Sequence, residues 1–160
     1  MNPATLNVVS CPQGGRGVQA KTPMPKTILL ADDSPIIGQT LYRALSAEGG
    51  YDLCAQAADG SEAISLAKRY KPDLVILDLA MPKMSGIETA RELKKIMPAV
   101  PIILLTLHAT TAKELFAGDS CVDSVIPKGD FTRLMARVRT LLCAEAGEDD
   151  TQFSKPIHEE

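Results

Sequence analysis

Apolar residues gather in five short, nearly unbroken runs along the chain. The runs are TILLA at 27–31, YDLCAQA at 51–57, LVIL at 74–77, IILL at 102–105 and VDSVI at 122–126, of which the second and fifth are weaker. Continuous rather than alternating apolar residues are typical of strands in a parallel sheet that is covered on both faces. The pattern therefore predicts five parallel strands.

Amphipathic segments between these runs predict five helices. Ser34-Pro35 marks the start of the first, Ser85 to Glu88 has capping-box spacing for the third, and Asp130 can cap the fifth. Alternating strands and helices predict a single doubly wound (βα)₅ domain of the α/β class. The apolar stripes behind this prediction are Ile37, Leu41, Ala44 and Leu45; Ala63, Ile64 and Ala67; Ile87, Ala90 and Leu93; Ala112, Leu115 and Phe116; and Leu134, Val138 and Leu141.

Charge is distributed unevenly over the 160 residues, whose formal net charge is −3. Residues 1–25, rich in Pro and Gly without periodicity, carry +2 and are expected to be a disordered leader. Residues 146–160 carry −4 and are expected to be an acidic, disordered tail. The domain at 26–145 carries −1, so it lacks the basic footprint of a nucleic-acid-binding protein.

The cysteines and apolar runs exclude several other classes. The four cysteines form no C-x-x-C pair, so a zinc site is not expected, and their scatter suits a reducing compartment. No apolar run reaches the length of a membrane span, and the N-terminus lacks the features of a signal peptide. We therefore expect a cytoplasmic protein without membrane contact.

Polar residues follow the predicted strands at the end where ligands bind in doubly wound folds. Asp32 and Asp33 follow the first strand, Asp78 the third, Thr106 the fourth and Lys128 the fifth. Clustered carboxylates repel one another unless a cation intervenes, and hard oxygen ligands suit Mg²⁺. Asp78 can then act as a nucleophile toward phosphorus, with Lys128 pairing with one phosphoryl oxygen and the Thr106 hydroxyl donating to another.

These motifs together resemble the receiver domain of two-component response regulators. The matching segments are ADDS at 31–34, ILDLAMPKMSGIE at 76–88, LLT at 104–106 and PK at 127–128. The separations are 45 residues from Asp33 to Asp78, 28 onward to Thr106 and 22 onward to Lys128. The resemblance covers about residues 26–145 and implies a flavodoxin-like three-layer sandwich with strand order 2-1-3-4-5.

The resemblance also implies roles for the residues of the site. Asp78 would accept a phosphoryl group from a histidine kinase or phosphotransfer protein. Asp32 and Asp33 would hold Mg²⁺, or alternatively Mn²⁺, together with Asp78 and the main-chain carbonyl of Ala80. Thr106 and Lys128 are expected to sense the phosphoryl group.

Signalling by such a domain depends on protein contacts. Phosphorylation would shift the fourth helix, fifth strand and fifth helix and so alter binding of a downstream protein. No output domain is recognised after residue 145, so a stand-alone, chemotaxis-type receiver is expected, monomeric or weakly dimeric. A receiver cut from a longer regulator is the alternative. It would not be an enzyme in the ordinary sense, because it catalyses only its own phosphorylation and dephosphorylation.

Several positions depart from the family pattern, among them Gly129, which follows Lys128 where proline is usual. Val125 replaces the aromatic residue that often couples to the threonine, and Leu107 follows Thr106 where a small residue is common, so that it is expected to crowd the site. Ala80 replaces a residue that is often polar, and without a side chain to orient water we expect slow loss of the phosphoryl group.

Two alternative functions remain. Val125 and Leu107 keep open a degenerate receiver that acts as a phosphorylation-independent interaction module. An Mg²⁺-dependent aspartyl phosphatase is less favoured, because that class needs a second carboxylate where Ala80 stands.

Overall fold

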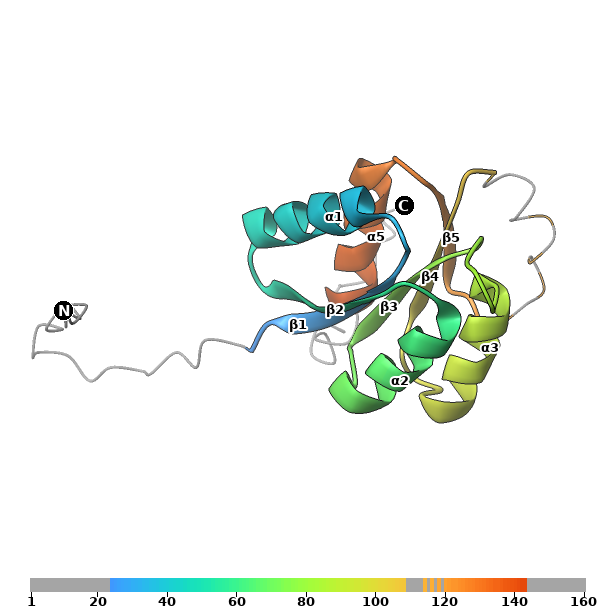
Figure 1. Ribbon diagram of the computed structural model, residues 1–160. Coiled ribbons are helices and arrows are strands. Elements are labelled where there is room, and N and C mark those ends of the chain that lie inside the picture. Colours follow the sequence, from blue (N-terminus) through green and yellow to red (C-terminus); the bar gives the residue numbers. More distant parts are fainter. Residues whose placement is uncertain (1–23, 109–113, 115, 117, 119, 144–160) are drawn as a thin grey trace, which may run out of the picture.

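The computed structural model describes residues 24–108, 114, 116, 118 and 120–143 of the chain. Within them lies a five-stranded parallel sheet with the order β2-β1-β3-β4-β5, which confirms the predicted fold class (Figure 1). The elements are β1 (Lys26–Ala31), α1 (Pro35–Glu48), β2 (Tyr51–Ala57), α2 (Gly60–Tyr70), β3 (Leu74–Asp78), α3 (Gly86–Ile96), β4 (Ile102–Thr106), β5 (Ser124–Pro127) and α5 (Phe131–Cys143).

Element boundaries differ little from the predicted ones, apart from the fifth strand. This strand begins at Ser124 rather than at Val122. The side chain of Asp123, just before it, accepts the backbone N–H of Ile102 on β4 at 2.8 Å. The predicted fourth helix lies largely outside the described residues, as do nearly all of the 1–25 leader and the whole of the 146–160 tail.

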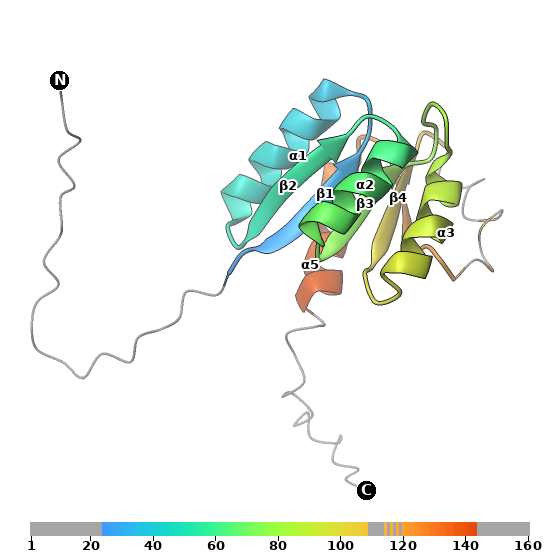
Figure 2. The same cartoon turned by 60° about the horizontal axis from the view of Figure 1, so that its bottom comes forward.

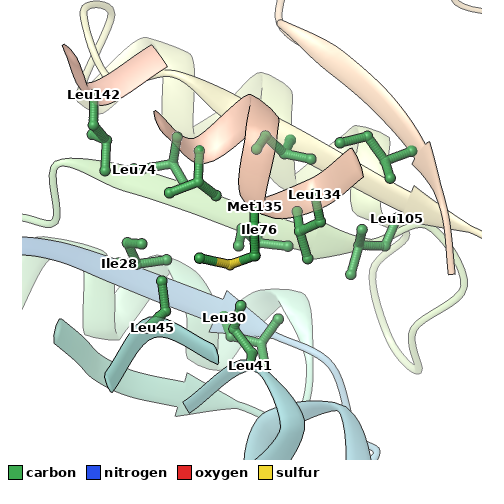
Figure 3. Close-up of a cluster of buried hydrophobic side chains, with 13 residues drawn as sticks. Ile28, Leu30, Leu41, Leu45, Leu74, Ile76, Leu105, Leu134, Met135 and Leu142 are labelled. Carbon is green, nitrogen blue, oxygen red and sulfur yellow. The ribbon is translucent and has the colours of Figure 1, made fainter. Parts of the chain in front are cut away.

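Successive strand residues point to opposite faces of the sheet, and each face has its own apolar core. Helices α1 and α5 cover one face, and α2 and α3 cover the other (Figures 1 and 2). The first core, shown in Figure 3, contains Ile28, Leu30, Leu41, Leu45, Leu74, Ile76, Ile103, Leu105, Ile126, Leu134, Met135, Val138 and Leu142. The second contains Leu29, Ala31, Ala57, Ala63, Ala67, Val75, Leu77, Ile87, Ala90, Leu93, Ile102, Leu104 and Cys121. Burial on both sides explains why the strands read as unbroken apolar runs.

Helix caps follow the predicted positions, with one difference in chemistry. The predicted capping box is present, because Ser85 Oγ accepts the N–H of Glu88 and the Glu88 carboxylate accepts the N–H of Ser85. Asp130 accepts the N–H of Arg133 at 3.1 Å at the start of α5. Ser34 occupies the N-cap of α1, but its side chain makes no capping hydrogen bond there.

The start of α3 lies so close to the end of β3 that only glycine fits at position 86. A Cβ atom on Gly86 would lie 2.3 Å from the carbonyl oxygen of Asp78, and the Gly86 N–H donates to the Leu79 carbonyl at 2.9 Å. This contact fixes the loop after Asp78 against the sheet. In the described part of the chain, no helix combines the length and apolar character that crossing a membrane requires.

Candidate functional site

Strand register brings two of the predicted carboxylates together. Ala31 on β1 pairs with Leu77 on the adjacent β3, so the next residues, Asp32 and Asp78, stand at the same level of neighbouring strands. Asp32 directly follows β1 and Asp78 ends β3. The residues just before them, Ala31 and Leu77, are fully buried, and Asp32 and Asp78 are themselves 0% and 3% exposed. Burial of two neighbouring acids calls for positive charge nearby.

Asp33 joins these two residues in a cluster of three carboxylates. One oxygen from each of Asp32, Asp33 and Asp78 lies within 4.8 Å of the others, and no other group of this kind occurs among the described residues. Oδ2 of Asp32 is enclosed and accepts no hydrogen bond. An all-oxygen donor set with an unsatisfied buried carboxylate oxygen fits a hard divalent cation such as Mg²⁺. Asp33 is exposed, so the cluster opens to solvent on its side.

Lys128 places a positive charge beside the carboxylates of Asp78 and Asp32. Its Nζ lies 2.8 Å from Oδ2 of Asp78 and 3.1 Å from Oδ2 of Asp32, the second contact being ionic rather than a well-aligned hydrogen bond. Its backbone N–H donates to the carbonyl of Thr106 at 2.8 Å, which anchors the segment after β5 to the end of β4. Lys128 therefore lies next to the carboxylates, at the same edge of the sheet, as the sequence predicts.

Burial and the neighbouring charges shift the pKa values of two groups in this cluster. Burial raises the pKa of the Asp78 carboxyl, and this outweighs the opposing effects of Lys128 and of the Ala80 N–H. Burial alone would lower the pKa of the Lys128 ammonium, but the carboxylates of Asp78 and Asp32 outweigh burial and raise it. The ammonium is thus held in its charged form against two acids.

Thr106 and Ala80 stand beside the cluster as the sequence predicts. Asp78 pairs in register with Leu105, so Thr106 lies one residue beyond it, buried at the end of β4. The backbone N–H of Ala80 donates to Oδ1 of Asp78 at 3.2 Å. The roles of the Thr106 hydroxyl and of the Ala80 carbonyl remain predictions.

The expectation that Leu107 crowds the site is wrong. Its side chain is 77% exposed, so it is not packed over the buried carboxylates. The next residue, His108, is also exposed, and its backbone N–H donates to the Thr106 hydroxyl at 3.2 Å.

Gln56 also contacts the site, although no sequence pattern singles it out. Its Nε2 donates to the carbonyl oxygens of Asp32 at 2.9 Å and of Ser34 at 3.2 Å. A glutamine near the end of a weak strand, 24 residues from its partner, looks like any exposed strand residue. Among the arginines of α5, Arg133 and Arg139 are exposed, whereas Arg137 is half-buried and donates to Ser124 and to the Asp123 carbonyl.

Comparison with known proteins is consistent with this geometry. A model of the response regulator receiver domain matches residues 28–139. The response regulator MprA from Mycobacterium sp. (strain KMS) is 36% identical over 120 residues, which cover 74% of this chain and 51% of MprA. The probable transcriptional regulatory protein TcrX from Mycobacterium tuberculosis is 33% identical over 119 residues, covering 74% and 50%. The chain thus spans about half the length of these curated relatives.

Solved structures of response regulators are also similar to this chain. A two-component response regulator of the LuxR family from Aurantimonas sp. SI85-9A1 is similar with a TM-score of 0.65 and 31% identity, covering 75% of this chain and 86% of that one. The complex of CheX, CheY, BeF₃ and Mg²⁺ from Borrelia burgdorferi is similar with a TM-score of 0.67 and 27% identity, covering 79% and 96%.

Proposed function

The chain belongs to the response regulator receiver domains of two-component signalling, and from that premise we propose that Asp78 accepts a phosphoryl group. The observation that carries the proposal is the position of Asp78. It is buried at the end of the central strand, within 4.8 Å of two further carboxylates and 2.8 Å from an ammonium. This is a nucleophile placed between a cation site and a fixed positive charge.

In the proposed step, a carboxylate oxygen of Asp78 attacks the phosphorus of a phosphohistidine on a histidine kinase or phosphotransfer protein. The new P–O bond forms as the P–N bond breaks, and the electron pair returns to the imidazole of the donor, which takes up a proton from solvent. Lys128 then pairs with one phosphoryl oxygen, and the Thr106 hydroxyl donates to another.

We propose that Asp32, Asp33, Asp78 and the main-chain carbonyl of Ala80 hold Mg²⁺, with Mn²⁺ as an alternative. Oδ2 of Asp32 supports this assignment, because it is enclosed, accepts no hydrogen bond and has only the Lys128 ammonium as an ionic partner. That one ammonium cannot neutralise three clustered carboxylates. The ion would neutralise charge on the phosphoryl oxygens.

The consequences lie in protein contacts rather than in turnover of a substrate. We propose that this cytoplasmic receiver catalyses only its own phosphorylation and dephosphorylation, since Ala80 stands where an aspartyl phosphatase needs a second carboxylate. The downstream protein would bind over β5 and α5, where a groove of about 380 Å³ includes Val125, Ile126, Arg133 and Arg137 in its lining. The CheX–CheY complex is an example of a related structure bound to another protein.

The test is the intact mass of the protein after incubation with acetyl phosphate and MgCl₂. We expect wild type to gain one phosphoryl group and Asp78→Asn to gain none, because an amide is not a nucleophile toward phosphorus. Asp52→Asn, which changes an exposed acid on the edge strand β2, should be phosphorylated like wild type.

If neither acetyl phosphate nor a phosphorylated phosphotransfer protein modifies wild type, the proposal is wrong. The phosphorylation-independent interaction module, which Val125 keeps open, would then be the better account. Modification of Asp78→Asn to the same extent as wild type would place the acceptor elsewhere.

A further inference from the structure

The loop between β1 and α1 carries two of the three clustered carboxylates, and much of its backbone is held by hydrogen bonds. The N–H of Asp32 donates to the Ala57 carbonyl at 3.0 Å, and the N–H of Ser34 donates to Oδ1 of Asp32 at 2.9 Å. These bonds satisfy two donors of the loop. They leave the carbonyl oxygens on either side of Asp33 to be satisfied by other groups.

Gln56, near the end of β2, donates to both of these carbonyls. Its Nε2 donates to the carbonyl of Asp32 at 2.9 Å and to the carbonyl of Ser34 at 3.2 Å. The second bond supplements the first hydrogen bond of α1, which is long, with 3.4 Å between the Gly38 nitrogen and the Ser34 oxygen. One side-chain amide therefore ties together the residues before and after Asp33.

Gly38, on the first turns of α1, leaves the space that this amide occupies. A Cβ atom at position 38 would lie 2.0 Å from Oε1 and 2.7 Å from Cδ of Gln56. Glycine in a helix interior is unfavourable relative to alanine, so its presence at a buried position needs a reason. Admitting the Gln56 amide against the loop is such a reason.

We infer that Gln56 is a positioning residue for the cation site, acting through the backbone of the β1–α1 loop. Asp33 is exposed, so burial does not fix the direction of its carboxylate, and the orientation of its backbone must do so. Holding the carbonyls on both sides of Asp33 sets that orientation before a cation arrives. The inference rests on the proposed Mg²⁺ site and adds to it a residue that touches no ligand.

The first experiment measures the Mg²⁺ dissociation constant of the full chain by ¹H–¹⁵N NMR titration with MgCl₂, for wild type and Gln56→Met. Methionine keeps the length of the side chain and removes the donors, whereas glutamate would add a charge beside the carboxylates. The dissociation constant should rise about three- to tenfold, the loss expected for one or two hydrogen bonds that orient the ligands. Gln39→Met, on the exposed surface of α1, is the matched control and should leave it unchanged.

The second experiment tests whether Gly38 and Gln56 act as one unit. Gly38→Ala should displace the amide and raise the dissociation constant as much as Gln56→Ala does. The double variant should bind Mg²⁺ no more weakly than Gln56→Ala alone. Without the Gln56 amide, the methyl group at position 38 has nothing to displace. A purely structural role would lower the thermal midpoint and leave Mg²⁺ binding unchanged.

The outcomes separate this inference from the proposed function. Wild type that shows no saturable Mg²⁺ binding would overturn both. Wild type that binds Mg²⁺ and is matched by Gln56→Met would overturn the positioning role alone, as would additive losses in the double variant.

Discussion

The ammonium nitrogen of Lys128 lies 2.8 Å from Oδ2 of Asp78, although 50 residues separate them in the chain. The same nitrogen lies 3.1 Å from Oδ2 of Asp32, so one lysine serves two buried acids. Three carboxylates face a single ammonium here, and the site keeps an excess of negative charge. This relationship governs how the stability of the protein should respond to substitution and to cations.

Lys128→Ala should destabilise the protein in buffer without divalent cations. It would leave Asp32 and Asp78 without their ionic partner, at a cost of about 1–3 kcal/mol in the free energy of unfolding. Adding MgCl₂ should stabilise this variant more than wild type, because the ion takes over the role of the ammonium. Urea unfolding followed by circular dichroism measures both effects.

Lys95→Ala is the matched control for that measurement. Its ammonium is largely exposed and pairs with Glu92 on the same helix, so the change should stay within about 0.5 kcal/mol with or without MgCl₂. Equal Mg²⁺ stabilisation of wild type and Lys128→Ala would contradict the assignment of the lysine to the cation site.

Gly86→Ala should disturb the loop after Asp78. The added methyl group would meet the Asp78 carbonyl oxygen, a backbone atom with no free rotation, so the loop or α3 must shift, at a cost of about 1–3 kcal/mol. Gly118→Ala, where the added atom meets nothing within 4 Å, should cost much less. Urea unfolding compares the two variants, and equal losses would count against a specific close approach at position 86.

The ion pair between Glu48 at the end of α1 and Arg139 on α5 should make stability depend on pH. The Arg139 guanidinium holds the pKa of Glu48 below its ordinary value of 4.5. A carboxyl whose pKa is lower in the folded state stabilises the protein above its unfolded pKa, and this contribution is lost as the pH falls through the folded pKa.

Glu48→Gln tests that dependence by removing the charge at similar size. Wild type should be more stable than the variant at neutral pH, and the difference should shrink in acid below about pH 4.5. Chemical unfolding of both proteins across this range gives the answer. A difference that is independent of pH would assign the effect to packing.

Ala80→Asn should shorten the lifetime of the phosphorylated protein. Ala80 is exposed two residues after Asp78, and its methyl group offers no hydrogen bond to an attacking water. An amide at this position can orient that water, so we expect faster hydrolysis than in wild type. Intact mass followed over time after removal of the phosphodonor measures the rate, with Ala80→Val as the apolar control.

The sequence by itself determined the five strands, four of the five predicted helices, the class of fold and the candidate residues. Buried parallel strands must be apolar on both faces, so they can be recognised in the sequence as continuous apolar runs. Polar residues at the ends of such runs are then easily identified. Asp32, Asp33, Asp78 and Lys128 could therefore be named before any contact was known.

Only the tertiary structure decided how those residues meet. Pairing of Ala31 with Leu77 buries Asp32 while Asp33 stays exposed, a difference between adjacent acids that no local pattern encodes. The exposure of Leu107 and the hydrogen bonds from Gln56 to the β1–α1 loop likewise depend on how distant segments pack. Apolar periodicity is a local property of the chain, whereas hydrogen bonds across 24 or 50 residues exist only once the strands have taken their register.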